Sequence, residues 1–315
     1  MLKGHTIAVV VPCFNEQKLI SRVLETMPTF VDRIIVVDDC STDNTVEIVE
    51  RHRERDQRVT LVVHEANQGV GAAIATGYKT SLSDSTSVTA VMAGDAQMDP
   101  AELESIVTPI INDECDFTKG NRLFSGDAWA MIPRTRYLGN AALSFFTKIA
   151  SGYWHIADSQ SGYTAINLRA LKTLDWDQMY KRYGQPNDLL VRLNVYNFRV
   201  RDVPIIPIYG IGEQSGVKPI RMIPGLFYLI VRLFIFRMFQ KYIIRDTHPL
   251  VLFYALGWPL LLAGQTLGVY LFLRRIMVGP VAETSALLAG FLFISGMQLI
   301  LFAMWMDMEN NKTLR

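Results

Sequence analysis

Two long stretches near the C-terminus, residues 249–273 and 284–306, contain no charged residue. A helix of about 20 apolar residues crosses the roughly 30 Å hydrocarbon core of a bilayer. Both stretches exceed that length, so the sequence predicts a hairpin of two transmembrane helices. The alternative is a helix pair buried in a water-soluble core. The connection between the two stretches is too short to form a domain.

The segment before the first span mixes apolar residues with basic ones. Its basic residues are Arg221, Arg232, Arg237, Lys241 and Arg245. Basic residues among Phe, Leu and Ile at helical spacing are typical of a helix that lies on an anionic membrane surface. Only Arg274 and Arg275 follow the span, so the positive-inside rule places both termini in the cytosol. We therefore expect an integral protein of a prokaryotic cytoplasmic membrane.

The N-terminal two thirds of the chain alternate between short apolar runs and segments with helical spacing. Runs rich in β-branched residues lie at 6–11, 33–37 and 59–64, and a fourth begins at Val88. Each ends in a polar turn that leads into a helix, and this pattern predicts a doubly wound α/β sheet. A later run, 198–208, carries two prolines, which favours an edge strand.

Composition excludes several other classes of protein. The formal net charge is +1, so no basic field argues for a nucleic-acid partner. The three cysteines lie far apart, without histidines at ligand spacing, which argues against a zinc site and a disulfide scaffold.

The fourth strand ends in a turn that contains Asp95 and Gln97. In doubly wound sheets, ligands bind at the carboxyl ends of the strands. A carboxylate and an amide oxygen two residues apart can face one hard cation, so the turn is a candidate site for Mg²⁺ or Mn²⁺. An aspartate in such a position can also be a simple turn former.

Six segments together resemble the motifs of family 2 glycosyltransferases. Residues 12–16 (PCFNE) resemble the P-x-[YF]-N-E opening, and 34–44 (IIVVDDCSTDN) the V-D-D-x-S-x-D segment. Residues 67–77 resemble the N-x-G-x-G-x-A loop, 93–97 the D-x-D-x-Q strand end, 120–122 the G-[SN]-R turn and 158–163 the D-x-x-S-G-[FY] segment. Within the family, the chain is most similar to the dolichyl- or polyprenyl-phosphate sugar synthases.

This resemblance implies a GT-A type, Rossmann-like domain that binds a nucleotide sugar, and a reaction that inverts the anomeric centre. Residues 1–215 would form this cytosolic domain, 216–246 an amphipathic juxtamembrane region, and 247–315 the transmembrane hairpin with a short cytosolic tail. The substrates would be a nucleotide-diphosphate sugar and a polyprenyl phosphate. A homo-oligomer is also compatible with the paired spans.

The resemblance also implies roles for individual residues. The donor nucleotide would be bound by Pro12, Glu16, Asp38, Asp39, Asn67 and Gly94. The metal ion would be held by Asp95 and Gln97, and the catalytic residues would be Asp95, Asp158 and Arg122. The acceptor phosphate would be bound by Arg122, Arg134, Arg136, Ser215 and Lys218, since guanidinium matches phosphate oxygens bidentately.

Several of these residues have alternative interpretations. The pair of Asp38 and Asp39 can instead form a helix-capping turn, in which Ser41 or Thr42 caps the next helix. Asp158 can orient the acceptor, act as a base towards a hydroxyl, or cap a turn. Each arginine can also be a surface or structural residue.

The chain departs from the family's motifs at two positions. Ala93 replaces the first acid of the D-x-D pair, and Val70 replaces a basic residue of the N-x-G-K loop. We expect Asp95 with Gln97 to suffice for the metal, the alternative being help from Asp99. Two rival functions remain: a membrane glycosyltransferase that acts on a hydroxyl of a lipid-linked saccharide or glycerolipid, and a non-catalytic membrane subunit.

Overall fold

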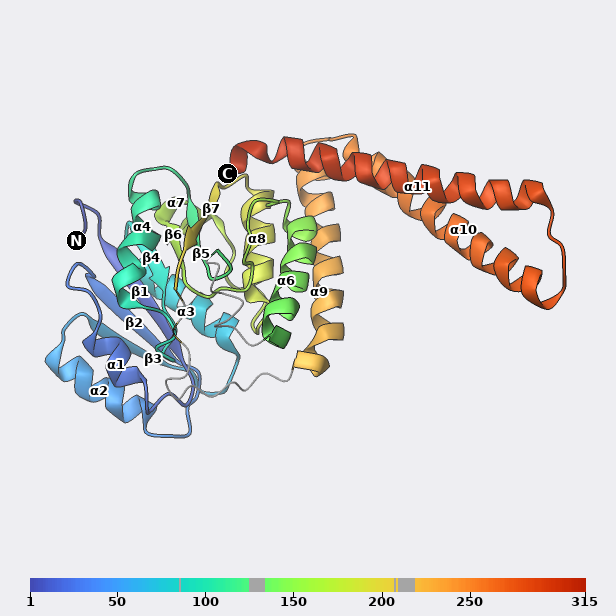
Figure 1. The fold of residues 1–315 in the computed structure, drawn as a ribbon. Coiled ribbons are helices and arrows are strands. Elements are labelled where there is room, and N and C mark those ends of the chain that lie inside the picture. The colour runs from blue at the N-terminus through green and yellow to red at the C-terminus, as the bar shows by residue number, and fades with distance from the viewer. Residues whose placement is uncertain (85, 125–133, 207, 209–218) are drawn as a thin grey trace. The chain divides into compact units, whose positions relative to one another are not determined.

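A computed structural model describes residues 1–84, 86–124, 134–206, 208 and 219–315 (Figure 1). The described chain divides into two compact units, Met1–Phe234 with Leu314–Arg315, and Ile235–Thr313. This division falls inside a helix, whereas the sequence placed domain boundaries at 215 and 246. The functional division into catalytic, juxtamembrane and hairpin regions stays a prediction.

The first unit is built on a seven-stranded sheet of order β3-β2-β1-β4-β6-β5-β7. Strands β3, β2, β1 and β4 are parallel neighbours, β6 is antiparallel to both β4 and β5, and β5 is parallel to β7. The strands are β1 (Ile7–Cys13), β2 (Arg33–Asp38), β3 (Val59–Val63), β4 (Val88–Val91), β5 (Phe117–Asn121), β6 (Thr164–Asn167) and β7 (Val200–Pro204).

Helices connect and cover these strands. They are α1 (Ile20–Glu25), α2 (Thr45–Arg55), α3 (Val70–Ser83), η1 (Pro100–Glu102), α4 (Leu103–Ile111), α6 (Arg134–Ser151), α7 (Leu168–Thr173) and α8 (Gln185–Val195). The predicted α/β fold, its four parallel strands and its edge strand β7 are confirmed. Strand β6 was not predicted, because its four residues carry no long apolar run and follow a polar loop.

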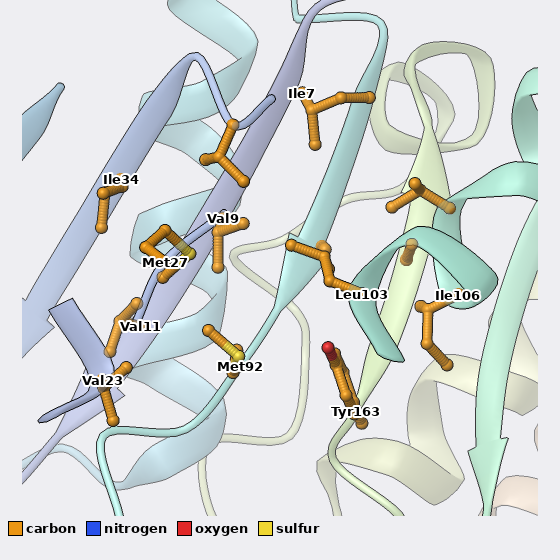
Figure 2. Close-up of a cluster of buried hydrophobic side chains, with 14 of the residues drawn as sticks. Ile7, Val9, Val11, Val23, Met27, Ile34, Met92, Leu103, Ile106 and Tyr163 are labelled. Atoms are coloured by element: carbon orange, nitrogen blue, oxygen red, sulfur yellow. The ribbon is translucent and has the colours of Figure 1, made fainter. Parts of the chain in front are cut away.

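The sheet has a hydrophobic core on each face, because side chains alternate along β1. Ile7, Val9 and Val11 pack on one face against residues of α1 and α4, such as Val23 and Leu103 (Figure 2). Ala8 and Val10 belong to the second core, with residues of α3, α7 and α8. Burying a side chain of the size of Val or Leu contributes about 1.5–3 kcal/mol.

The second unit contains the hairpin of α10 (Leu250–Met277) and α11 (Glu283–Asn310). Glycines bring the two backbones together: a Cβ on Gly264 would lie 2.4 Å from the Phe293 nitrogen, and one on Gly296 would lie 2.3 Å from the Leu261 nitrogen. Small residues at such contacts are typical of helices packed in membranes. Of the most apolar stretch of each helix, only 22% is buried. The apolar side chains thus face outward, which argues against a helix pair inside a soluble core.

Three described helices are long and apolar enough to cross a membrane: the two of the hairpin, and residues Ile223–Arg245. The third comprises most of α9 (Pro219–Phe239) and the π-helix η2 (Gln240–Arg245). The basic residues of the sequence predict a helix on the membrane surface here. By length and composition the segment also qualifies as a span, and its interfacial placement stays a prediction.

Two of the basic residues assigned to this surface helix are buried inside the second unit. Arg237 donates from Nη1 and Nη2 to the two carboxylate oxygens of Asp307, at 2.8 and 2.9 Å, and is fully buried. Lys241 Nζ donates to Asn311 Oδ1 at 2.7 Å. The interpretation of Arg237 and Lys241 as residues that face lipid headgroups is therefore wrong. They pair with the C-terminal end of α11 instead.

Candidate functional site

The carboxyl ends of β1, β2 and β4 form one edge of the sheet. The Asp39 amide donates to the Cys13 carbonyl at 2.9 Å, and the Gly94 amide donates to the Pro12 carbonyl at 3.1 Å. A Cβ on Gly94 would stand 2.9 Å from the Cys13 Cβ, so only glycine allows this approach. The contacts gather most of the residues predicted to bind donor and metal: Pro12, Glu16, Asp38, Asp39, Gly94, Asp95 and Gln97.

Asp38 is fully buried at the end of β2. Its carboxylate accepts hydrogen bonds from the Ser41 hydroxyl at 2.5 Å and from the Ser41 amide at 2.8 Å. The alternative in which Ser41 or Thr42 caps α2 is wrong, because Asn44 is the N-cap residue and the Thr42 hydroxyl donates to Asn15 Oδ1. Asp43 Oδ1 accepts the amide of Thr45 instead, at 3.0 Å. Asp38 thus holds the turn that follows β2, and a direct contact with the donor stays a prediction.

Asp39 holds the loop after β3 in the same way. Its two carboxylate oxygens accept the amides of Gln68 and Gly69, at 2.9 and 2.7 Å. Asn67 Nδ2 donates to the Asp39 carbonyl at 3.2 Å. His64, which no motif of the sequence marks, contacts Asp39 Oδ1 through Nδ1 at 2.8 Å. The predicted donor-binding residues Asp39 and Asn67 therefore lie together, and Asp39 fixes the shape of the loop.

Glu16 and Asp95 bring negative charge to the same edge. Burial raises the pKa of Glu16 to about 7, and the charges of Asp95 and Asp43 add to this effect. The Glu16 amide is anchored by Thr45 Oγ1 at 2.8 Å. Two carboxylates whose charges disfavour one another are a natural setting for a cation.

The donor set of this edge fits a hard divalent ion. Asp95 Oδ1 accepts the Gln97 amide at 3.1 Å, in a turn whose middle residue Ala96 has a φ of +56°. Among the described residues, no group of three His, Cys, Asp or Glu side chains could hold a metal. An ion here would thus take few ligands from protein, as Mg²⁺ commonly does when phosphate and water complete its shell. Asp99 caps η1 by accepting the Ala101 amide at 2.9 Å.

A second group of polar residues lies between β5 and the loop 158–163. Arg122 donates from Nε and Nη2 to the two carboxylate oxygens of Asp158, at 2.7 and 3.1 Å. Asp158 is fully buried. Burial alone would raise the pKa of Asp158, but the Arg122 guanidinium and its hydrogen bonds hold that pKa below its usual value. The structure thus brings together two of the three predicted catalytic residues, as an ion pair.

Lys119 of β5 also belongs to this group, although the sequence does not indicate it. It is 1% exposed, and its Nζ donates to the Ser161 carbonyl at 2.5 Å. Burial lowers its pKa to about 8, although Asp158 partly opposes the shift. Gly120 donates its amide to the Tyr163 carbonyl at 2.8 Å. The end of β5 therefore holds the loop 158–163 at three points, and no motif in the sequence marks Lys119.

Two described residues that follow β7, Ile205 and Ile208, contact the two groups. Ile205 donates its amide to the Asn121 carbonyl at the end of β5, and Ile208 donates to the Gln97 carbonyl beside Asp95, both at 3.1 Å. A cavity of about 380 Å³ lies beside Ile208, between α1 and residues 96–101. Ile205 therefore lies on the Arg122 side of the site, and Ile208 lies at the predicted metal turn.

The other residues predicted for the acceptor phosphate remain untested. Arg134 and Arg136 lie in the first turn of α6, but their side chains are outside the described part of the structure. Ser215 and Lys218 are outside the described residues altogether. Their joint action with Arg122 stays a prediction.

Comparisons with known proteins identify the family. Residues 8–175 match the model of Glycosyl transferase family 2. A UDP-N-acetylglucosamine–dolichyl-phosphate N-acetylglucosaminyltransferase of Methanococcus voltae is 31% identical over 242 residues, which cover 72% of this chain and 95% of the relative. An undecaprenyl-phosphate mannosyltransferase of Micrococcus luteus is 25% identical over 213 residues, with 66% and 86% covered.

Solved structures support the assignment of the fold. Glucosyl-3-phosphoglycerate synthase from Mycobacterium tuberculosis, crystallised with Mn²⁺, UDP and phosphoglyceric acid, superposes with a TM-score of 0.55 at 18% identity, over 74% of this chain and 78% of that one. The predicted GT-A type of α/β fold is thereby confirmed. From the match of the family model and the extent of the similarity to the relatives, the chain belongs to glycosyl transferase family 2.

Proposed function

We propose that this enzyme transfers a sugar, with inversion, from a nucleotide-diphosphate donor to a polyprenyl phosphate at the cytosolic face of a membrane. Relatives named for dolichyl-phosphate and undecaprenyl-phosphate acceptors support the acceptor class. The three apolar helices support delivery of the acceptor from a bilayer.

The state of Asp158 is the observation that carries the choice of acceptor. A sugar hydroxyl needs a general base, usually a positioned carboxylate. Asp158 is fully buried, engaged on both oxygens by Arg122, and held ionised by that contact, so it is a poor base. A lipid phosphate is already ionised near neutral pH, with a second pKa of about 6. It needs positioning rather than deprotonation, which favours the phosphate over the hydroxyl.

The roles of the residues follow from this choice. Asp95 and Gln97 would hold Mg²⁺ or Mn²⁺, which when bound neutralises charge on the leaving nucleotide diphosphate. Asp38 and Asp39 would shape and line the pocket of the donor nucleotide. Arg122 would contact the acceptor phosphate while Asp158 fixes its orientation. Arg134, Arg136, Ser215 and Lys218 are further candidates for the acceptor phosphate.

The test is a transfer assay with the purified full-length protein in lipid nanodiscs. Radiolabelled nucleotide sugars are supplied one at a time with Mn²⁺, and the acceptor is a polyprenyl phosphate, the matched polyprenol without phosphate, or a glycolipid. We expect label to enter the phosphate lipid alone and EDTA to abolish the transfer. Transfer to the polyprenol, or to a glycolipid hydroxyl, would support the rival hydroxyl-directed enzyme. Absence of transfer from every donor would favour the non-catalytic subunit.

A further inference from the structure

A basic segment crosses the loop that Asp39 holds. The carbonyl of Lys181 accepts the Ala72 amide at 3.1 Å. A Cβ on Gly69 would stand 2.6 Å from the Lys181 carbonyl oxygen and 2.9 Å from Arg182 Cγ. Gly69 has a φ of +100°. Glycine is therefore required at position 69 for two reasons. Its backbone has a positive φ, and residues 181–182 pack too closely against it to leave room for a Cβ.

This crossing places two cations next to the carboxyl end of β2. The Gly69 amide donates to Asp39 Oδ2 at 2.7 Å. Arg182 packs against Gly69, so it lies one residue away from Asp39 in space. Lys181 and Arg182 both have exposed side chains. The positive end of the α3 helix, which begins at Val70, lies at the same place.

The two side chains lack an acidic partner among the residues that the structure describes. Two acids of the same segment of the chain are engaged elsewhere: Asp188 pairs with Arg192 and accepts the Tyr180 amide, and Asp177 pairs with Lys79. Adjacent exposed cations beside a helix N-terminus repel one another, and an anionic ligand removes that repulsion.

From this juxtaposition we propose that Arg182, assisted by Lys181, binds the diphosphate of the nucleotide donor. The inference rests on the proposed function and deepens it, by assigning a donor-binding residue from the segment between α7 and α8. Guanidinium is suited to this contact because its N–H groups match two phosphate oxygens at once. The site lies on the Asp39 side of the sheet edge, and the residues proposed for the acceptor phosphate lie elsewhere, around Arg122.

Binding of nucleoside diphosphates to the full-length protein in detergent micelles tests the proposal. Uridine, guanosine, adenosine and cytidine diphosphates are titrated by calorimetry with Mn²⁺ present, and the tightest is carried forward. We expect Arg182→Ala to weaken its binding by about 10- to 100-fold, the usual effect of losing a charge-assisted hydrogen bond. Affinity for the corresponding nucleoside, which has no phosphate, should not change between wild type and variant.

Two further variants sharpen the result. Lys172→Ala removes an exposed cation of α7 and serves as the matched control, with no expected effect. Val70→Lys restores a cation next to Gly69, and in the Arg182→Ala background it should recover part of the lost affinity. A rescue of this kind is not expected if Arg182 only supports the loop.

The outcomes separate this inference from the proposed function. If wild type binds a nucleoside diphosphate and Arg182→Ala binds it equally well, the inference alone is overturned. If the variant changes only the KM for polyprenyl phosphate, Arg182 belongs to the acceptor site and the inference is again wrong. If wild type binds none of the four diphosphates, the proposed function fails, and the inference fails with it.

Discussion

Arg122 and Asp158 form a bidentate ion pair in which the carboxylate is entirely buried and the arginine side chain is 21% exposed. One partner of the pair is thus locked inside the fold while the other reaches its surface. The carboxylate also accepts the Gln160 amide at 3.1 Å, so the pair is tied to the loop 158–163. This arrangement suits a positioning role for Asp158 and a ligand-binding role for Arg122.

Removing the charge of Asp158 should destabilise the protein. Asp158→Ala leaves Arg122 and the buried Lys119 without their shared anion, and breaking a buried pair costs about 3–5 kcal/mol. Thermal unfolding in detergent should show a lower midpoint than wild type. Asp175→Ala, at an exposed aspartate, is the control and should have little effect.

A double-mutant cycle separates the pair from its surroundings. In Arg122→Gln, Asp158 still has the positive charge of Lys119 nearby. This variant should therefore lower the free energy of unfolding by less than Asp158→Ala does. If the two residues act as one unit, the double variant should be clearly more stable than the sum of the single effects implies. Additive effects would contradict the ion pair.

The pH dependence of stability should reveal Lys119. Its pKa in the fold is about 8, below the 10.5 of a free lysine, so the unfolded chain binds more protons between these values. The contribution of Lys119 to the free energy of unfolding therefore rises with pH through this window, by at most about 1.4 kcal/mol per pH unit. In Lys119→Met this rise is absent.

The measurement compares unfolding midpoints of wild type and Lys119→Met at pH 7.5 and pH 10. Other groups titrate equally in both proteins, so the difference between them isolates Lys119. We expect the unfolding midpoint of wild type to rise relative to that of the variant as pH increases. A constant difference would mean that folding does not lower the pKa of Lys119.

Glu16 should show the opposite sign of pH dependence. Its pKa is raised from 4.5 to about 7, first by burial and then by Asp95, so its ionisation opposes folding. The contribution of Glu16 to the free energy of unfolding is greatest below pH 4.5 and is lost as pH rises through 7. Glu16→Gln removes this loss. In EDTA, the variant should therefore unfold at a higher temperature than wild type at pH 8, with the advantage shrinking at pH 5.

The sequence could predict the sheet edge better than the details of the site. Periodic β-branched runs are a local signal, so the parallel strands and the turn at Asp95 were found. The burial of Lys119 and its bond to Ser161 depend on a contact between segments far apart in the chain, which no local pattern encodes. The same holds for His64 and for Arg182, each of which acquires its place from a neighbouring loop. The order of the motifs identifies the residues at the carboxyl edge of the sheet. It does not indicate that the side chains of Asp38 and Asp39 point inward and hold the loops that follow β2 and β3.

Arg237 and Asp307 form a fully buried ion pair in the second unit. Tyr242 OH also donates to Asp307 Oδ1 at 2.5 Å, and Asn311 Nδ2 donates to the same oxygen at 2.9 Å. The Asp307 carboxylate therefore accepts hydrogen bonds from three side chains, those of Arg237, Tyr242 and Asn311. Because every partner is buried, removing the Asp307 carboxylate leaves the Arg237 charge buried without a counter-ion. Asp307→Ala should therefore cost about 3–5 kcal/mol.

A control for this variant lies two residues further along α11. Glu309 and Lys312 form an exposed pair at 3.4 Å, and exposed pairs contribute about 0–1 kcal/mol. Thermal unfolding of the full-length protein in detergent should therefore separate Asp307→Ala from Glu309→Ala by a wide margin. The exchange variant, Arg237→Asp with Asp307→Arg, should recover part of the loss, because it restores opposite charges at the two positions. Equal midpoints for Asp307→Ala and Glu309→Ala would show that this ion pair does not hold the end of α9 to α11.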